Sequence, residues 1–411
     1  MQLIPIPIRG TEFTSRSGKV KGPPVKTRVI IMALSSFLSM QPRLIAATTE
    51  ESDTILDDAP FTTARANALG GALSTIAEDL DAIYYNPAGI GGLGFDASPR
   101  KSPFTSTFVF PYAGVSMNQT ADTVRKEFSA KGAQSDANAG AAILDAHAGK
   151  RQYLRATLMP MGFISGRIAV APTIDHQIAA VPMPDNPGQV HMRYRTFSGT
   201  IIGSSVADYA NRLSLGVSQT IGTIQETDGT FDYLDFADVE KRKTALGENR
   251  KTYTASTTNV GLTIRLPKKI APTFAIVARN MGNTKNRATN PADEPLYFNE
   301  DLTAGASISP KLGKFGRLNV LVEASHLTQI HVPAIKKLHG GVELLVGGDN
   351  GHAPVGIRLG GNEAGMSYGM HLNLELIGIE AESHAVNIGV NNNRVIERRT
   401  SFISYINIAS F

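Results

Sequence analysis

The feature that most constrains the fold is an alternation of apolar and polar residues with a period of two. It recurs from about residue 104 to the end of the chain. In "MSYGMHLNLEL", residues 366–376, every even-numbered residue is apolar, and the odd-numbered positions carry Ser, Gly, His, Asn and Glu. Successive side chains of a β-strand point to opposite faces. The segment therefore predicts a strand with one apolar and one polar face. Residues 259–266, 302–309 and 317–324 repeat the pattern, although Leu321 interrupts the polar face of the last.

About fourteen such segments divide the chain. They lie near 104–114, 156–165, 167–180, 189–203, 211–224, 252–266, 270–281, 298–309, 315–327, 336–347, 353–361, 364–376, 377–389 and 396–411. Strands of about eight to thirteen residues exceed the five to six that are usual in soluble sandwiches. They suit a tilted membrane strand of about 9–11 residues.

A soluble barrel or β-sandwich also alternates, with its polar face toward water, so the pattern alone does not choose between them. Strand length, strand number, an export signal and the absence of a helix-rich half together favour a membrane barrel, whose apolar face points outward. We therefore predict an all-β fold, a closed transmembrane antiparallel β-barrel of about fourteen strands.

The amino-terminal region has the form of a secretory signal peptide. Lys26 and Arg28 precede the apolar run 29–40, and small residues precede a polar stretch, so we expect residues 1–47 to be removed, with cleavage near Ala47 or at Ala46. A buried helix is the alternative. The basic region is unusually long for a signal peptide. This length is explained if the gene start is misplaced and translation begins at Val25, so that residues 1–24 are not made.

Charge argues against a nucleic-acid partner. The chain has a net charge of +4, but seven Lys and Arg residues and a single acid lie within the first 47 residues, so the remainder is slightly acidic. A protein that binds polyanions requires a basic surface. No segment after residue 47 reaches about eighteen consecutive apolar residues, so we expect no transmembrane helix. An exported chain of this kind can still span a membrane as a closed barrel.

These inferences place the protein in the outer membrane of a Gram-negative cell, in contact with outer-membrane lipid. The tail "RTSFISYINIASF" ends on Phe411, with Ile403 and Tyr405 in the same register. A terminal aromatic on an alternating last strand is typical of the signal read by the barrel-assembly machinery. Asn407 and Ala409 depart from that pattern. The chain has no Trp and 7% aromatic residues, which is few for aromatic girdles.

Two long connections interrupt the alternation. Residues 116–152 are polar and Ala-rich and are predicted to be a helical insertion. Residues 224–252 carry acids first and bases after, and are predicted to be a solvated loop. Long loops of outer-membrane barrels lie on the extracellular side.

The stretch "AEDLDAIYYNPAGIGGL", residues 77–93, is the strongest candidate for chemistry. Glu78, Asp79 and Asp81 do not have the spacing of a calcium loop, and nothing indicates a second carboxylate placed across a substrate. The chain has no Cys, its nine His residues form no His-x-x-x-His pair, and it contains no Gly-x-Ser-x-Gly motif. We therefore expect no enzymatic activity, no metal site and no cofactor.

A structural interpretation suits the same stretch better. Asn86 can cap a short helix with Pro87 at its first position. Gly89 and the glycines after it permit tight turns. Tyr84 and Tyr85 present rings with polar tips. The segment is predicted to be a compact, sharply folded unit immediately before the first strand.

The segment "ARANALGGALSTIAEDLDAIYYNPAGI" resembles the amino-terminal signature of the FadL-like and PorV-like outer-membrane proteins. The matching residues are Arg65, Ala66, Gly70, Gly71, Ala72, Ala77, Glu78, Asp79, Ala82, Asn86, Pro87, Ala88, Gly89 and Ile90. Ala68 and Leu69 depart from the family's Gly-Met. The resemblance is sharp over 61–95 and loose over 335–411.

The resemblance implies a fourteen-stranded barrel, residues 101–411, with residues 48–100 folded into its lumen as a hatch or plug. The hatch residues would be Arg65, Gly70, Gly71, Asp79, Asp81, Tyr84, Tyr85, Asn86, Pro87, Ala88 and Gly89. We expect Asp79 and Asp81 to bind backbone amides or a lumen Arg, and Asn86-Pro87 to seat the plug.

Three functions are compatible with this fold. FadL-like proteins pass hydrophobic compounds such as long-chain fatty acids, which implies a channel gated by the hatch. PorV-like proteins act as platforms or shuttles for secreted proteins, and an ordinary porin-like barrel is the third alternative. The inward faces include Arg265, Arg317, Glu323, His371 and Glu375, a polar set that weighs mildly against an apolar lumen.

Overall fold

The computed structural model describes residues 61–90, 106–130, 137–186, 188–208, 212–267, 269–330, 332–347, 353–374, 376–389 and 394–409. These residues belong to one compact unit. The predicted signal peptide, the proposed start at Val25, Glu375 and Phe411 lie outside the described residues.

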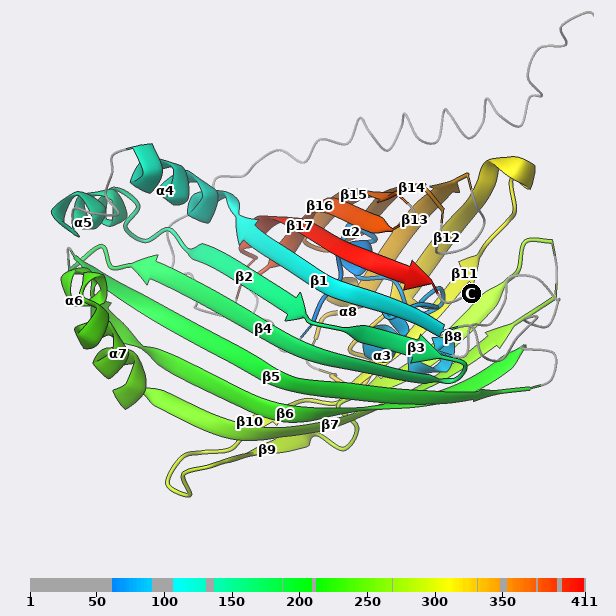
Figure 1. Cartoon of the computed structure of the whole chain (residues 1–411), viewed down its shortest axis with the longest axis horizontal. Coiled ribbons are helices and arrows are strands. Elements are labelled where there is room, and N and C mark those ends of the chain that lie inside the picture. The colour runs from blue at the N-terminus through cyan, green and yellow to red at the C-terminus, as the bar shows by residue number, and fades with distance from the viewer. Residues whose placement is uncertain are drawn as a thin grey trace, which may run out of the picture. The chain divides into compact units, whose positions relative to one another are not determined.

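The described strands form one antiparallel sheet that closes on itself, because β1 pairs with β17 on one side and with β2 and β3 on the other (Figure 1). The strands are β1 Ser106–Asn118, β2 Gln152–Met159, β3 Gly162–Ser165, β4 Ile168–Pro182, β5 Gln189–Ala207, β6 Leu213–Asp232, β7 Arg250–Arg265, β8 Thr273–Arg279, β9 Thr284–Ala288, β10 Leu296–Phe298, β11 Asp301–Ile308, β12 Gly316–Ala324, β13 Leu338–Val346, β14 Val355–Asn362, β15 Gly365–Leu374, β16 Ile377–Asn387 and β17 Ile396–Ala409.

Three pairs of these segments are each one interrupted barrel strand. Both β2 and β3 lie between β1 and β4. Both β8 and β9 border β7, and β10 and β11 follow them as the next strand. The sheet is therefore a closed barrel of fourteen antiparallel strands, and each overlaps one of the predicted segments.

The predicted faces are confirmed. On β15, His371 and Asn373 point inward and are buried, whereas Tyr368 and Met370 point outward and are each more than half exposed. Leu321, the exception on β12, also points inward, where it packs against the amino-terminal segment. The apolar residue on the polar face therefore has a partner inside the barrel.

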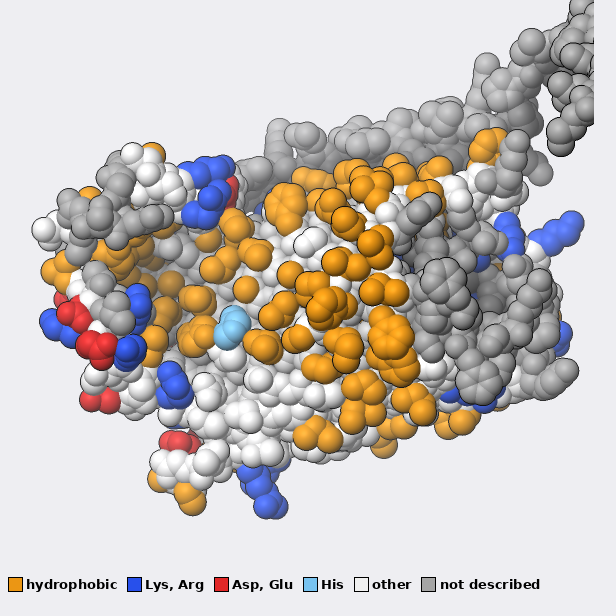
Figure 2. Space-filling view, in the orientation of Figure 1, with side chains coloured by type: hydrophobic (Ala, Val, Ile, Leu, Met, Phe, Trp, Pro, Cys, Tyr) orange, Lys and Arg blue, Asp and Glu red, His pale blue; other side chains and the backbone are white. Residues whose placement is uncertain are grey.

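An apolar belt covers the outer face near the end of the barrel that holds the C-terminus. On β6 the outward residues from Leu213 to Ile221 are mostly apolar and half exposed, and the next three, Thr223, Gln225 and Thr227, are polar. On the paired strand β7 the same change occurs between Thr258 and Val260. Figure 2 shows hydrophobic side chains in a broad band over β1–β7. The belt is the surface that a membrane barrel presents to lipid.

The connections at the opposite end, here called the loop end, contain the helices α4 Gln119–Ala130, α5 Ala137–Ala146, α6 Tyr233–Ala237 and α7 Val239–Glu248. The predicted helical insertion at 116–152 contains α4 and α5. The prediction of a loop over 224–252 is wrong in its bounds, because β6 continues to Asp232 and β7 begins at Arg250. These strand ends extend beyond the belt toward the loop end. Their outer faces are mostly polar, so the sequence pattern predicts a loop there. No described helix is both long and apolar enough to cross a membrane.

The belt predicts where a charge is costly. We expect Val217→Arg, in the middle of the belt on β6, to lower the free energy of unfolding by about 2–4 kcal/mol, because the guanidinium would face lipid. Gln225→Arg, on the same face above the belt, should change it by less than about 1 kcal/mol. Urea unfolding in lipid vesicles, followed by circular dichroism, measures both values. Equal losses would contradict the assignment of the belt.

Candidate functional site

Residues 61–90, here called the plug, lie inside the barrel (Figure 1, blue). They contain α2 Ala64–Ala68, α3 Ala82–Tyr85 and the 3₁₀ turn η1 Pro87–Gly89. Leu69, Leu73, Ile76, Ile83 and Ile90 are almost fully buried in one apolar cluster. The cluster also contains inward-facing residues of β1–β5, β12 and β17. Plug and wall therefore share one core.

Asn86 joins the plug to the wall. Its Nδ2 donates to the Ser74 carbonyl at 2.7 Å and to Thr263 Oγ1 of β7 at 2.7 Å. Its Oδ1 accepts from the backbone N–H of Ala88 at 3.1 Å and caps η1, with Pro87 at the first position. The predicted cap is confirmed.

Neighbouring wall residues complete the Asn86 seat. Ser214 of β6 donates its hydroxyl to the Ala88 carbonyl at 2.6 Å. Gly261 of β7 faces Asn86, and a Cβ at that position would overlap the Asn86 side-chain oxygen. Gly89 sits against Ala77, where a Cβ would meet the Ala77 carbonyl. Glycine at 261 therefore permits the close approach of plug and wall.

A glycine turn follows α2. Gly70 and Gly71 have φ of +68° and +94°, in the region that favours glycine. The Gly70 carbonyl accepts from His339 Nδ1 of β13 at 2.7 Å and from Asn362 of β14 at 3.4 Å. Since Nδ1 donates there, His339 Nε2 accepts the Ser325 hydroxyl at 2.8 Å. The turn is thereby held against two adjacent strands.

A buried ion network fixes Arg65. Its Nε and Nη2 donate to the two carboxylate oxygens of Glu343 on β13, at 2.9 and 2.8 Å. Arg358 of β14 donates to Glu343 at 2.9 Å and to Glu380 at 2.8 Å, and Asn319 donates to Glu343 at 2.8 Å. The Glu343 side chain is fully buried. A bidentate Arg–carboxylate pair fixes orientation as well as position.

The acids of the plug contact cations of two kinds. Asp79 and Asp81 lie 3.4 and 3.8 Å from Arg65, which belongs to the plug itself, and Asp79 also accepts the Asp81 backbone N–H at 3.0 Å. Glu78 instead binds the lumen residue Arg265, at 2.8 Å. The predicted amide contact is confirmed for Asp79. The Arg beside Asp79 and Asp81 belongs to the plug, and the wall residue Arg265 pairs with Glu78, because pairing across the lumen depends on strand placement.

Burial, reinforced by the neighbouring Asp79 carboxylate, raises the pKa of Asp81 well above its ordinary value. Burial also raises the pKa of Glu78, against the opposing effect of Arg265. Glu78 therefore links the plug to the wall, whereas Asp79 and Asp81 pair with Arg65 within the plug. Among the described residues no group of three or more His, Asp and Glu side chains is arranged to hold a metal ion.

Glu323 of β12 is a second seat for the plug. One of its carboxylate oxygens accepts the backbone N–H groups of Leu73 and Ser74, at 3.1 and 2.9 Å, and the Ser74 hydroxyl at 2.7 Å. The sequence marks Glu323 as an inward charge. The sequence pattern alone does not distinguish Glu343, Arg358 and Ser214 from other residues at inward positions of alternating strands, although that inward position is itself a signal.

Aromatic rings pack between the plug and β1. The rings of Phe61 and Tyr84 stack at 3.9 Å, Phe61 lies 5.4 Å from Tyr112 of β1, and Tyr112 lies 6.0 Å from Tyr405 of β17. The Tyr84 hydroxyl bonds to Thr173 at 3.0 Å. Tyr85 accepts the Thr63 backbone N–H at 3.2 Å, and burial raises its pKa to about 12.

This cluster places the predicted assembly residues. Ile403 and Tyr405 of β17 face the lumen and pack against the plug cluster. The outward residues of β17 include Phe402 and Ile408, which are 62% and 47% exposed. The odd-numbered register of the tail is therefore the inner face in the described residues. A role of Ile403, Tyr405 and Phe411 in assembly stays a prediction.

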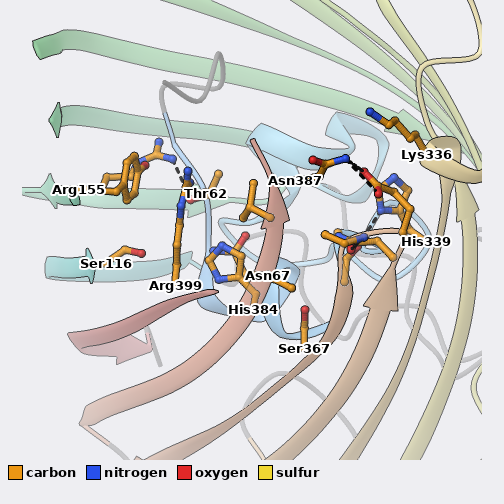
Figure 3. Close-up of a pocket in the computed structure, with 18 of the residues that line it drawn as sticks. Thr62, Asn67, Ser116, Arg155, Lys336, His339, Ser367, His384, Asn387 and Arg399 are labelled. Carbon is orange, nitrogen blue, oxygen red and sulfur yellow. Dashed lines mark hydrogen bonds between the residues drawn. The ribbon is translucent and has the colours of Figure 1, made fainter. Parts of the chain in front are cut away.

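A polar basin of about 400 Å³ lies on the loop side of the plug (Figure 3). Lys336 and His339 line one side, and Arg155 and Arg399 line the opposite side. A narrow crevice continues from the basin along the inner face of β1, from Ser116 past Gly114 to Tyr112. The basin thus leads toward the aromatic cluster.

The ladder between β1 and β2/β3 is interrupted below that crevice. Phe110 and Pro111 of β1, and Pro160 and Met161 between β2 and β3, have no register partner across it. Each side contributes a Pro, which cannot donate to the ladder. We call these four residues the wall break. The interruptions in β8/β9 and β10/β11 lie beyond Val260 toward the loop end, outside the belt.

Apolar groups lie on both sides of the wall break. Phe110 and Met161 are 51% and 49% exposed within the belt. Inside, Tyr112, Met159 and the plug residue Leu80 belong to the buried cluster. Inside and outside are therefore both apolar where the wall lacks its regular hydrogen bonds.

The sequence matches no protein-family model and no curated protein. Among solved structures, the chain is similar to a deltaS2S3 mutant of the monoaromatic hydrocarbon channel TodX, with 7% identity, a TM-score of 0.46 and coverage of 85% of this chain and 98% of that chain. It is similar to the Ralstonia pickettii toluene transporter TbuX, with 11% identity, a TM-score of 0.42 and coverage of 86% and 100%. A Pseudomonas aeruginosa FadL homologue matches at 9% identity, with a TM-score of 0.25 and coverage of 84% and 97%.

Asn86 is predicted to hold the plug against β6 and β7. Asn86→Ala removes a helix cap and two buried hydrogen bonds and should weaken plug docking by about 2–4 kcal/mol, while the strands stay folded. Hydrogen exchange of peptides from 74–90 should rise, and that of β12–β16 should not. Asn67→Ala, which loses a single 3.3 Å bond to Glu382, is the matched control. Unchanged protection of 74–90 would contradict the role of Asn86.

Glu343 should contribute more than any surface acid. Glu343→Gln leaves Arg65 and Arg358 buried without their shared counter-charge, and we expect a loss of about 3–5 kcal/mol in urea unfolding. Glu240→Gln breaks an exposed pair with Lys243 and should cost less than about 1 kcal/mol. Similar losses in both variants would show that the network is not energetically coupled to the fold.

Proposed function

We propose that the protein conducts small apolar molecules across the outer membrane and releases them sideways, through the wall break, into the lipid. The observation that carries this proposal is the position of the wall break. It lies in the apolar belt, and apolar side chains of plug and wall stand directly behind it. A regular ladder at that height would close the barrel to lipid.

The basin and the crevice supply the entrance. A molecule that enters from the loop end meets the plug at Thr62 and Asn67 and is directed along β1 toward Tyr112. Past Tyr112, the path is lined by Met159 and Leu80. The buried apolar cluster to which these residues belong contains no charged residue. Polar molecules are therefore disfavoured at the exit, since each would lose its hydration there.

The exit is closed by side chains and not by the whole plug. Leu80 fills the space over Gly162 of β3, where a Cβ would overlap the Leu80 side chain and come within 2.9 Å of Met159 Sδ. Met side chains adapt readily to new shapes. Arg65, Asn86 and the Glu323 seat anchor the plug elsewhere. Rotation of Leu80 and Met159 therefore opens the path while those anchors stay in place.

A reversible cross-link tests the exit. The chain has no Cys, so the double variant Phe110→Cys/Met161→Cys places a unique pair across the wall break. We expect toluene uptake into liposomes, relative to a polar control such as glucose, to fall at least about fivefold when the pair is oxidised and to recover on reduction.

The matched control is Val115→Cys/Ala156→Cys, an outward pair joined across the regular part of the same ladder. Its oxidation should leave toluene uptake unchanged. Undiminished uptake by a fully oxidised Phe110→Cys/Met161→Cys barrel would exclude release through the wall break. Absence of stimulated uptake by the unmodified protein, for both toluene and a long-chain fatty acid, would exclude transport of apolar molecules.

A further inference from the structure

The β12–β13 connection exposes apolar side chains at the edge of the belt. Ile330 is 95% exposed, Ile335 of α8 Ala334–Lys337 is 65% exposed and Leu327 is 39% exposed. We call these three residues the apolar rim. A single exposed apolar residue is ordinary on a protein surface, but several that adjoin an apolar interface indicate a partner.

The apolar rim is held in place by hydrogen bonds. The backbone N–H of Ser325 donates to the Lys337 carbonyl at 2.9 Å, and that of Leu327 donates to the Leu302 carbonyl of β11 at 2.9 Å. Thr328 Oγ1 donates to the Glu300 carbonyl at 3.0 Å. These bonds present the apolar side chains from an ordered turn.

Strand length places the apolar rim at the height where lipid ends. β12 and β13 have 9 residues each, which matches both the apolar part of β6, 213–221, and the length of a membrane strand. The outward residues Val322 and Leu338, at the loop end of β12 and β13, are 58% and 53% exposed. The belt therefore reaches the β12–β13 connection that carries the rim.

The opposite wall differs. β5 and β6 have 19 and 20 residues, and on β6 the outward residues Thr223, Gln225 and Thr227, which follow the apolar part, are polar. The connection above β6 exposes charged pairs such as Glu240–Lys243. Loops on that side stand clear of the lipid, whereas the β12–β13 connection begins where the lipid begins.

We infer that the apolar rim inserts into the outer boundary of the bilayer. It would anchor the side of the barrel formed by the short strands β12 and β13 in the acyl region beneath the lipid headgroups. Lys337 follows the rim, and a Lys at this depth can extend its ammonium toward headgroup phosphates. Lys336 lines the basin and has no part in this contact. The inference needs the barrel and its belt and is independent of what the barrel transports.

Fluorescence tests the anchor, because the chain has no Trp. Ile330→Trp places one reporter on the rim, and Leu234→Trp places one on α6, where Leu234 is 48% exposed. Both variants are refolded into phosphatidylcholine vesicles whose acyl chains carry bromine. We expect Ile330→Trp emission to be blue-shifted and quenched at least about twofold more than Leu234→Trp emission.

Bromine in both leaflets makes the readout independent of orientation. Equal quenching of the two variants, or red-shifted emission from both, would overturn the anchor. Circular dichroism and the heat-dependent gel shift verify folding. If Ile330→Trp does not fold, Ile335→Trp gives the same test, with the same two outcomes.

Discussion

The carboxylate of Glu343 is the point at which wall and plug become one structure. It faces inward from β13 and accepts from Arg65 of the plug and from Arg358 and Asn319 of the wall. A buried charge is tolerated only when it is paired and hydrogen-bonded. The plug therefore supplies Glu343 with a second counter-charge beside Arg358, and the wall supplies the buried Arg65 with its bidentate partner. The polar lumen face, mildly unfavourable to an apolar channel when considered alone, serves to bind the plug.

Lipid imposes the second constraint. Backbone groups that face a bilayer must find partners within the protein, so a sheet that spans the membrane must close. Within the belt this barrel breaks its own ladder between β1 and β2/β3, and prolines on both sides reduce the number of donors left without partners. The break is tolerable because apolar side chains cover it inside and out. The plug obstructs the axis of the barrel, and at the height of the wall break the β1–β17 ladder also shifts register, between Val109 and Tyr112.

The barrel is also asymmetric along its circumference. β4–β7 rise well past the belt and hold α6 and α7 clear of it, while β12–β15 end close to its edge. The basin lies on the loop side of the plug, between β1 and β2 on one side and the short strands on the other. The different strand lengths thus determine from which side the plug is accessible. The short strands β12 and β13 also place the apolar rim at the level of the lipid.

The sequence by itself determined what depends on local pattern. Period-two alternation located all fourteen strands and assigned their faces, since neighbouring side chains of a strand must point to opposite sides. Asn86-Pro87 indicated its own helix cap, because a cap needs only residues a few positions apart.

Tertiary structure decided everything that joins distant residues. Arg65 and Glu343 are 278 positions apart, and no local pattern states which inward acid meets which cation. The strand ends near 224–252 read as loop because polar residues on both faces carry no alternation. Ile403 and Tyr405 turned inward because the register of β17 is set by its pairing with β1 and by the plug. Closure of the sheet brings these residues together, and closure is a property of the whole chain.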